Sequence, residues 1–453
     1  MNAPRSHVRD MVRAHDKTRE LQRRLAGLEP RLRRRWPDAP LASALGTIDL
    51  GGRVGELERD MEALAAFTDR GAGVTRLAWS PELRSAYDWL AGRCRQLGLD
   101  VEVDAAGNLL ARWDTGRGPA VLMGSHIDTV PQGGRFDGAL GVMGGLHAVR
   151  LLRKWGVAPR RPVWLVAFMD EENTRFNTAL FGSRSFCGED LGGLGDRRDA
   201  DGVTLAEAMG AWGRDPERHG EARRIDDVGH YLELHVEQGP SLGAGGTDIG
   251  VVTSIVGLVG YRARVTGQTN HAGTTPMRLR RDALAGAARS VLAIRDQARA
   301  REDATANVGV IRVVPGSSNV IPGICELTID LRAPSAAGLR ELDDGCLAAL
   351  RAIAGEEGLV LELAETYRVP PAPMSGELVE LIEGAAAIEG ASTARMPSGA
   401  GHDAMVLAAH VPAGMLLVPS RDGVSHSPDE YTSPSQCELG ARVLARAVAA
   451  LVS

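Results

Sequence analysis

The stretch from Gly124 to Val142, GSHIDTVPQGGRFDGALGV, is the part of the sequence that decides the fold. It places His126, Asp128 and Asp137 among small and apolar residues, where an apolar run gives way to a helical pattern. Burying charge without compensation costs several kcal/mol. The stretch therefore predicts a strand-to-helix junction whose charges are balanced by an ion-pair partner or by a metal.

The length and composition limit the class of protein. A chain of 453 residues exceeds one ordinary core, so two domains are expected. Its 44% hydrophobic and 24% charged residues are typical of a soluble globular protein. A net charge of −6 gives no basic surface for nucleic acid, and no apolar run approaches the roughly 18 residues of a membrane span. We expect neither nucleic acid nor membrane as a partner.

The cysteines and the N-terminal segment indicate in which cellular compartment the protein is expected. The five cysteines are scattered without a CxxC spacing, which favours a reducing compartment and a cytoplasmic protein. Residues 1–45 form an extension rich in arginine that lacks the apolar segment of a signal peptide. We interpret it as a solvated helix or tail.

Four short apolar runs predict buried, mostly parallel strands, and helical patterns alternate with them, so the fold class is α/β. The runs are AVLMGSH (120–126), PVWLVAFMDEE (162–172), YLELHVEQG (231–239) and GMLLVPSRDGVSH (414–426). Each ends in, or just before, a histidine or an acid. Because ligands bind beyond the carboxyl ends of strands in open α/β sheets, these side chains are expected to converge.

A different pattern of predicted strands and helices lies between the third apolar run and the fourth. Over residues 252–366 the pattern is βαββαβ, with a doubled strand at its start, which predicts an inserted α+β domain of the ferredoxin-like type. The first domain resumes at MSGELVELIEGAAAIEG. It would then be discontinuous, covering residues 46–251 and 367–453.

The strand ends carry a mixed set of nitrogen and oxygen donors: His126, Asp137, Glu172, His235 and His426. Such a set suits zinc, manganese or cobalt better than calcium or magnesium. Five ligands exceed one tetrahedral zinc, and they suit two divalent ions about 3.5–4 Å apart that share a carboxylate. Asp137, between a strand and the N-terminus of a helix that it would cap, is the natural bridge.

Two further acids are expected beside the ligands. Asp128 can accept the second ring N–H of His126 and so fix its tautomer. Glu171 and Glu172 end a strand, where successive side chains diverge. One can ligate while the other acts as general base.

Each feature has a simpler interpretation. A histidine near a strand is often packed in a core, an aspartate before a helix often only caps it, and tandem glutamates often face solvent. These interpretations would have to hold at four strand ends at once. We keep the core interpretation for His147, His219, His230 and His410.

Seven motifs now make a family recognisable. They are GSHIDTVPQGGRFDGALGV, MDEENTRF, ELHVEQGP, GQTNHAGTTPM, SSNVIPG with DLRA, SGAGHDA and VPSRDGVSHSPDEYT. Together, over about residues 50–450, the chain resembles the amidase/carbamoylase branch of the M20 dimetal peptidase family. That branch holds N-carbamoyl-L-amino-acid hydrolases, β-ureidopropionases and allantoate amidohydrolases. The departures are EEN where many members have EEG, and the basic N-terminal extension.

The resemblance implies a role for each matching residue. His126, Asp137 and His235 would hold one metal, and Asp137, Glu172 and His426 the other. Glu171 matches the catalytic base, and His271 the histidine that the lid and dimerisation domain contributes to the active site of the other subunit. Gln238, Asn319 and Arg332 match substrate contacts. A strand-edge ion pair for Arg332, and turn or backbone bonding for Asn319 and Gln238, remain alternatives. His402 is assigned no role.

The implied activity is metal-dependent hydrolysis of the C–N bond of an N-carbamoyl-L-amino acid by a homodimer. Allantoate or ureidoglycolate amidohydrolysis is the alternative, with the same machinery and a more polar pocket. A dipeptidase or aminoacylase of the wider family, or a binding protein that has kept the fold, would be further possibilities. HVEQGP and HAGTTPM argue against the peptidase, and the complete ligand set with Glu171 argues against the binding protein.

Overall fold

The computed structural model describes residues 55–453, so the basic extension predicted at residues 1–45 lies outside the described residues. The described chain forms two compact units. The first contains residues 55–253, 374–396 and 402–453, and the second contains residues 254–373 and 397–401. The predicted insertion, 252–366, differs at both ends. Strand β6 (Ile249–Ile255) pairs with β15 of the large sheet, and β12 (Val360–Val369) continues beyond the predicted end.

The first unit is built on a large sheet with the order β1-β2-β4-β3-β5-β15-β6-β13, and β14 also pairs with β6. Its centre is parallel: β3 pairs with β4 and β5, and β5 pairs with β15. These are the four predicted runs, so that prediction is confirmed. The hairpin β1-β2 and the antiparallel pairing of β2 with β4 were not predicted. The strands not yet delimited are β1 (Asp100–Val103), β2 (Leu109–Trp113), β3 (Ala120–His126), β4 (Val163–Phe168), β5 (Val228–Val236), β13 (Ala372–Pro373), β14 (Thr393–Ser398) and β15 (Ala413–Val418).

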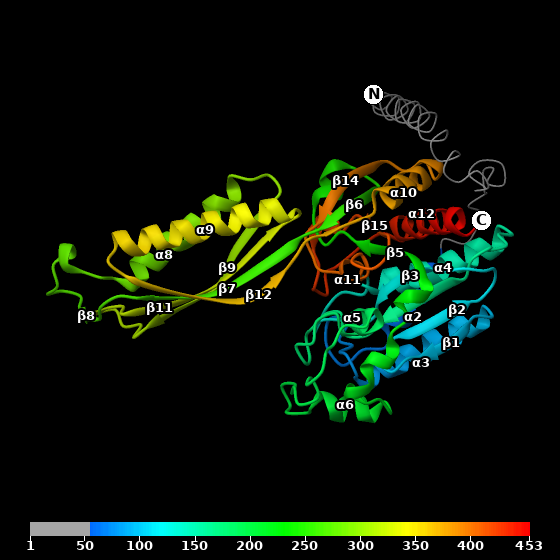
Figure 1. Cartoon of the computed structure of the whole chain (residues 1–453), viewed down its shortest axis with the longest axis horizontal. Helices are drawn as coiled ribbons and strands as arrows, with labels where there is room; N and C mark the ends of the chain where they lie inside the picture. The colour runs from blue at the N-terminus through cyan, green and yellow to red at the C-terminus, as the bar shows by residue number, and fades with distance from the viewer. Residues whose placement is uncertain (1–54) are drawn as a thin grey trace, which may run out of the picture. The chain divides into compact units, whose positions relative to one another are not determined.

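Helices cover both faces of this sheet (Figure 1). On β5, Leu234 packs against Gly144 of α4 and Gly440 of α12, while the next side chain, Glu233, accepts a hydrogen bond from Ala404 N in α11 on the opposite face. The helices of this unit are α2 (Gly55–Ala65), α3 (Pro81–Gln96), α4 (Ala139–Lys154), α5 (Phe181–Cys187), α6 (Leu205–Ala211), α7 (Ser241–Gly245), α10 (Gly376–Ile388), α11 (Asp403–Leu407) and α12 (Pro434–Val452), with 3-10 turns η1 (Pro216–Ala222), η2 (Ile225–Asp227) and η4 (Arg421–Gly423).

The second unit is a four-stranded antiparallel sheet with the order β12-β7-β11-β9. Helices α8 and α9 lie on one face of it (Figure 1). Along β11 buried and half-buried residues alternate, because one face of the strand meets the helices. The elements follow the predicted βαββαβ order: β7 (Gly257–Thr266), α8 (Ala283–Arg299), β9 (Thr305–Val314), β11 (Ile324–Ala333), α9 (Ala336–Glu356) and β12. A short pair, β8 (Asn270–His271) with β10 (Val320–Ile321), and the 3-10 turn η3 (Met277–Leu279) complete the unit.

Several single-residue expectations can be compared with the fold. His147 and His219 are buried, whereas His410 is exposed, so its core interpretation is wrong; it follows α11 at a surface turn. The five cysteines are all buried and unpaired. Within residues 55–453, no helix combines the length and apolar character needed to cross a membrane.

Candidate active site

The carboxyl ends of the parallel strands bring the predicted ligands together. His126 is the last residue of β3 and His235 lies near the end of β5, while Glu172 and His426 follow β4 and β15. Two groups result, each with its donor atoms within 4.8 Å of one another: His126, Asp137 and His235 in one, and Asp137, Glu172 and His426 in the other. Asp137 belongs to both groups.

Asp137 does not cap α4, and that prediction is wrong. Gly138 occupies the N-cap with φ 61°, and no side chain caps the helix. A Cβ atom at Gly138 would fall 2.3 Å from the His126 ring, which explains a glycine there. The Asp137 carboxylate instead lies 3.2 Å from His235 Nε2 and 3.1 Å from His426 Nε2. Burial opposes ionisation, but these two imidazoles hold the pKa of Asp137 well below its usual range.

Asp128 connects the two sides of the cluster. Its backbone carbonyl lies 3.1 Å from His126 Nδ1 and its carboxylate lies 3.5 Å away, so the carbonyl is the nearer partner of the ring, not the carboxylate we expected. The carboxylate accepts hydrogen bonds from the backbone N–H groups of Glu171 and Glu172, at 3.4 and 3.2 Å. Asp128 thus holds the orientation of His126 and the position of the tandem glutamates.

The side chains of Glu171 and Glu172 diverge. A Glu172 oxygen lies 3.5 Å from His426 Nε2, whereas Glu171 faces His126 Nε2 at 3.7 Å and belongs to neither donor group. Burial raises the pKa of Glu171 well above its usual value and that of Glu172 to about 7. Asn173 follows with φ 59°, a left-handed conformation that asparagine tolerates better than most residues.

The donors fit divalent metal ions. The carboxylates of Asp137, Glu171 and Glu172 lie beside imidazoles, and Asp137 also accepts hydrogen bonds from Gln238 and Ser425; within residues 55–453 no arginine or lysine pairs with them. Buried carboxylates without a cation are costly. Imidazole and carboxylate together are the ligands that zinc, manganese and cobalt accept.

Gln238 lies against the same cluster. Its Nε2 donates to Asp137 Oδ2 at 2.8 Å, and its backbone has φ 56° directly after β5. Its Oε1 is buried and has no hydrogen-bond partner among the described residues. Gln238 therefore orients the shared carboxylate and still offers an acceptor.

His271 and Asn319 come together in the second unit. They belong to the β8–β10 region, where Ala272 N donates to the Asn319 carbonyl at 3.0 Å. His271 Nδ1 accepts from the backbone N–H groups of Gly273 and Thr274, at 3.1 and 3.2 Å. The ring proton is therefore on Nε2, and the exposed imidazole presents an N–H donor outward.

Arg332 forms an ion pair with Asp330, as the alternative to substrate binding predicted. Its Nε donates to Asp330 Oδ1 at 2.7 Å, and its Nη1 donates to the Gly399 carbonyl at 2.9 Å. Tyr367 also donates to Asp330, at 2.6 Å. The guanidinium is therefore held in one orientation, and capture of a substrate carboxylate stays a prediction.

Two residues that the sequence left without a role lie at the cluster. His402 is buried, with its ring 4.5 Å from that of His235, and burial holds its pKa well below the usual value. Glu430 is buried below Asp137 and accepts a hydrogen bond from its backbone N–H. Glu430 lies four residues after His426 and directly after the surface acid Asp429, and this position in the sequence does not distinguish a buried acid from an exposed one.

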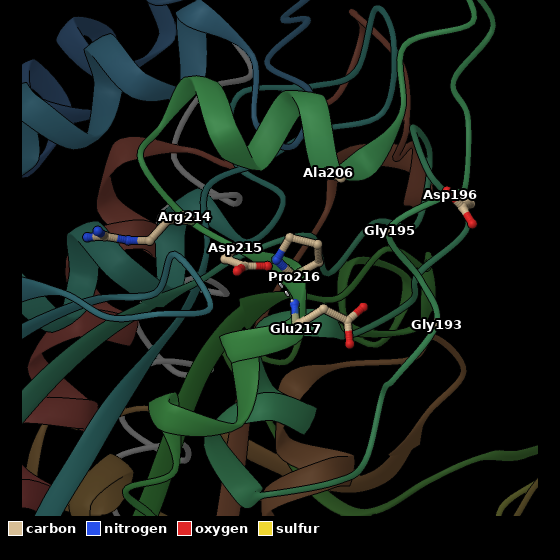
Figure 2. Close-up of a pocket in the computed structure, with 8 residues that line it drawn as sticks. All are labelled: Gly193, Gly195, Asp196, Ala206, Arg214, Asp215, Pro216 and Glu217. Atoms are coloured by element: carbon tan, nitrogen blue, oxygen red, sulfur yellow. Dashed lines mark hydrogen bonds between the residues drawn. The ribbon is translucent and has the colours of Figure 1, made fainter.

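An open cleft of about 480 Å³ lies elsewhere in the first unit, beside α6 and η1 (Figure 2). None of the predicted site residues lines it. Its Asp215 accepts from Glu217 N as the cap of η1, and its Arg214 donates to the Val103 carbonyl. These contacts give this cleft a structural role and leave the strand ends as the candidate site.

Comparison with known proteins shows which family the chain belongs to. Residues 122–450 match the model of peptidase family M20/M25/M40. The chain belongs to this family. Among its relatives, an N-carbamoyl-L-amino acid amidohydrolase of Geobacillus stearothermophilus is 40% identical over 85% of this chain and 95% of that protein. An allantoate amidohydrolase of Bacillus subtilis is 36% identical over 82% and 91%.

Within the M20 family, solved structures share the fold as well as the sequence. A hydantoinase/carbamoylase family amidase from Burkholderia multivorans has a TM-score of 0.80 and 35% identity, covering 88% of this chain and 98% of that one. The predicted family and fold class are thus confirmed.

Proposed function

We propose that this protein hydrolyses the C–N bond of an N-carbamoyl-L-amino acid, giving the amino acid, ammonia and carbon dioxide. One observation carries the proposal: Asp137 is shared by two donor groups, with Glu171 beside them and outside both. That arrangement is suited to amide hydrolysis at a pair of metals. The N-carbamoyl-L-amino acid relative at 40% identity supports the substrate class.

Each metal position would be held by three side chains of this chain. His126, Asp137 and His235 would hold one ion, and Asp137, Glu172 and His426 the other. When bound, such ions supply Lewis-acid chemistry, which polarises a carbonyl and lowers the pKa of water. The donors are consistent with zinc, manganese or cobalt.

Glu171 and His271 would move the proton and stabilise charge. Glu171 would take a proton from a water molecule as the water oxygen attacks the ureido carbon. It would then return the proton to the amino-acid nitrogen as the C–N bond breaks. The carbamic acid released then decomposes to ammonia and carbon dioxide. His271 Nε2–H would donate to the oxygen that becomes negative in the transition state.

Arg332 would bind the substrate carboxylate, with Asp330 keeping the guanidinium in place. Gln238 and Asn319 would bind other polar groups of the substrate. If this assignment is right, free acids should be hydrolysed far faster than the corresponding amides or esters, because these lose the charge-assisted hydrogen bonds from the guanidinium to the carboxylate. Equal rates for free and esterified substrates would contradict it.

We also propose a homodimer built through the second unit. The exposed large apolar side chains of the described residues all belong to this unit, and Val310, Ile311 and Val314 lie on its edge strand β9. An exposed apolar edge strand is a ready surface for pairing with another chain. In this proposal each subunit supplies His271 to the active site of its partner, as the family resemblance implies.

A kinetic panel tests the substrate class. Chain reconstituted separately with zinc, manganese or cobalt would be assayed on N-carbamoyl amino acids, allantoate, ureidoglycolate and dipeptides. We expect the highest kcat/KM for an N-carbamoyl-L-amino acid. A preference for allantoate would support the alternative that the Bacillus subtilis relative suggests, and a preference for dipeptides would overturn both.

A further inference from the structure

Glu430 joins the two segments of chain that carry Asp137 and His426. Its Oε1 accepts hydrogen bonds from Phe136 N at 2.8 Å and Asp137 N at 3.1 Å. Its Oε2 accepts from the hydroxyl of Ser425, at 3.0 Å. One buried carboxylate therefore fixes the backbone of the shared ligand and the residue next to a second ligand.

The surroundings of Glu430 leave its side chain little freedom. Only 5% of the residue is exposed, and a Cβ atom at Gly134 would meet its carboxylate at 2.2 Å. The neighbouring rings of Phe136 and Tyr431 pack edge to face, with centroids 6.1 Å apart. The loop after β15 is thus attached to the segment before α4 by this carboxylate and one aromatic pair.

The partners of Glu430 indicate what it does. All three are neutral donors, and within residues 55–453 no arginine or lysine forms an ion pair with it. Burying a carboxylate without a cation is costly, so these hydrogen bonds have to offset the lost hydration. Here its hydrogen bonds are directed to the two ligand-bearing segments, as is usual for groups that orient metal ligands.

We propose that Glu430 is a positioning residue for the metal pair, setting Asp137 and His426 at the spacing that lets them share an ion. This inference rests on the proposed function, because it needs divalent ions at the two donor groups. Loss of Glu430 should weaken metal binding most at the position held by Asp137, Glu172 and His426. The rings of His126 and His235 are oriented by their own hydrogen bonds to backbone carbonyls.

The test measures Co²⁺ binding by the full chain, using chelator competition and the visible absorption of the bound ion. We expect Glu430→Ala to weaken one of two Co²⁺ sites about 10- to 100-fold and to change its spectrum, a typical cost of losing such an orienting group. Glu430→Gln retains an acceptor for the two N–H groups, so its affinity should stay near that of the wild type. Ser425→Ala, a milder change, should weaken the same site by less.

Glu438 offers the matched control. It is another buried glutamate, and its polar contact among residues 55–453 is with His147 rather than with a segment that carries a predicted ligand. Glu438→Ala should change the melting temperature without changing Co²⁺ affinity. If the wild type binds two ions and Glu430→Ala binds both with wild-type affinity, or if Glu430→Gln is as weak as Glu430→Ala, the inference is wrong. A wild type that binds no divalent ion would instead overturn the proposed function, and this inference with it.

Discussion

At the scale of single residues, neighbouring side chains in the candidate site face different partners because successive residues after a strand diverge. Glu171 and Glu172 share one hydrogen-bond acceptor, Asp128, through their backbone N–H groups, yet their carboxylates face different histidines. This arrangement lets one acid remain free beside the ligand groups. It also makes the roles of the pair separable by mutation.

Glutamine substitutions at these two positions should have different effects. Glu171→Gln should retain its metal content and lose at least about 10²–10⁴-fold in kcat, because general-base catalysis contributes that much. Glu172→Gln should lose metal as well as activity. Elemental analysis and steady-state kinetics on both variants check this. Metal loss in Glu171→Gln with metal retained in Glu172→Gln would mean that the two roles are reversed.

At the scale of elements, the sequence predicts strands that are buried or long and misses strands that are both short and half-exposed. Strands β3, β4 and β15 are buried throughout, and their continuous apolar runs were recognisable. Strand β1 has four residues and none is fully buried, so DVEV carries no such pattern. Short half-exposed strands depend on pairing with a neighbour, which periodicity alone does not show.

The residues of the candidate site also differ in how far the sequence predicts them. The cluster of donor side chains at the strand ends was predictable, because the chemistry of these side chains contrasts with the apolar runs before them. Glu430 was not, because a loop acid looks the same whether it faces water or backbone N–H groups. The capping role of Asp137 was wrong because Gly138 adds one residue before the helix begins.

The contact between η1 and α5 should be sensitive to acid. His219 in η1 accepts a hydrogen bond from Leu191 N and contacts Ser185 of α5, and burial lowers its pKa. The folded protein therefore favours the neutral ring. Its contribution to stability is complete above the unfolded value of about 6.5 and is lost as the pH falls below it.

Melting temperatures measured at about pH 7.5 and about pH 5, on either side of the ordinary histidine pKa of about 6.5, check this. His219→Gln, which cannot gain a proton, should lose less on acidification than the wild type. His410→Gln, changed at an exposed histidine, should follow the wild type. A His219→Gln variant as sensitive to acid as the wild type would show that His219 is not responsible.

At the scale of the whole molecule, the proposed functional groups are divided between the two units. The metal ligands and Glu171 belong to the first unit, and His271, Asn319 and Arg332 to the second. If dimerisation through β9 completes the site, Ile311→Arg should give a monomer with normal metal content and little activity. Sedimentation, metal analysis and kinetics on the same sample check this. A fully active monomer would contradict it.

Mixing two inactive variants decides which subunit supplies His271. His271→Ala should keep its metals, since no ligand is touched, and lose about 10²–10³-fold in turnover, the usual effect of removing an oxyanion donor. Co-refolded with Glu171→Gln, it should form heterodimers in which one site has both an intact Glu171 and an intact His271 from the partner. Random pairing makes half of the dimers mixed, each with one working site, so about a quarter of the wild-type activity should return. If His271 instead serves its own subunit, each site of a heterodimer lacks one of the two groups, and proven heterodimers should stay inactive.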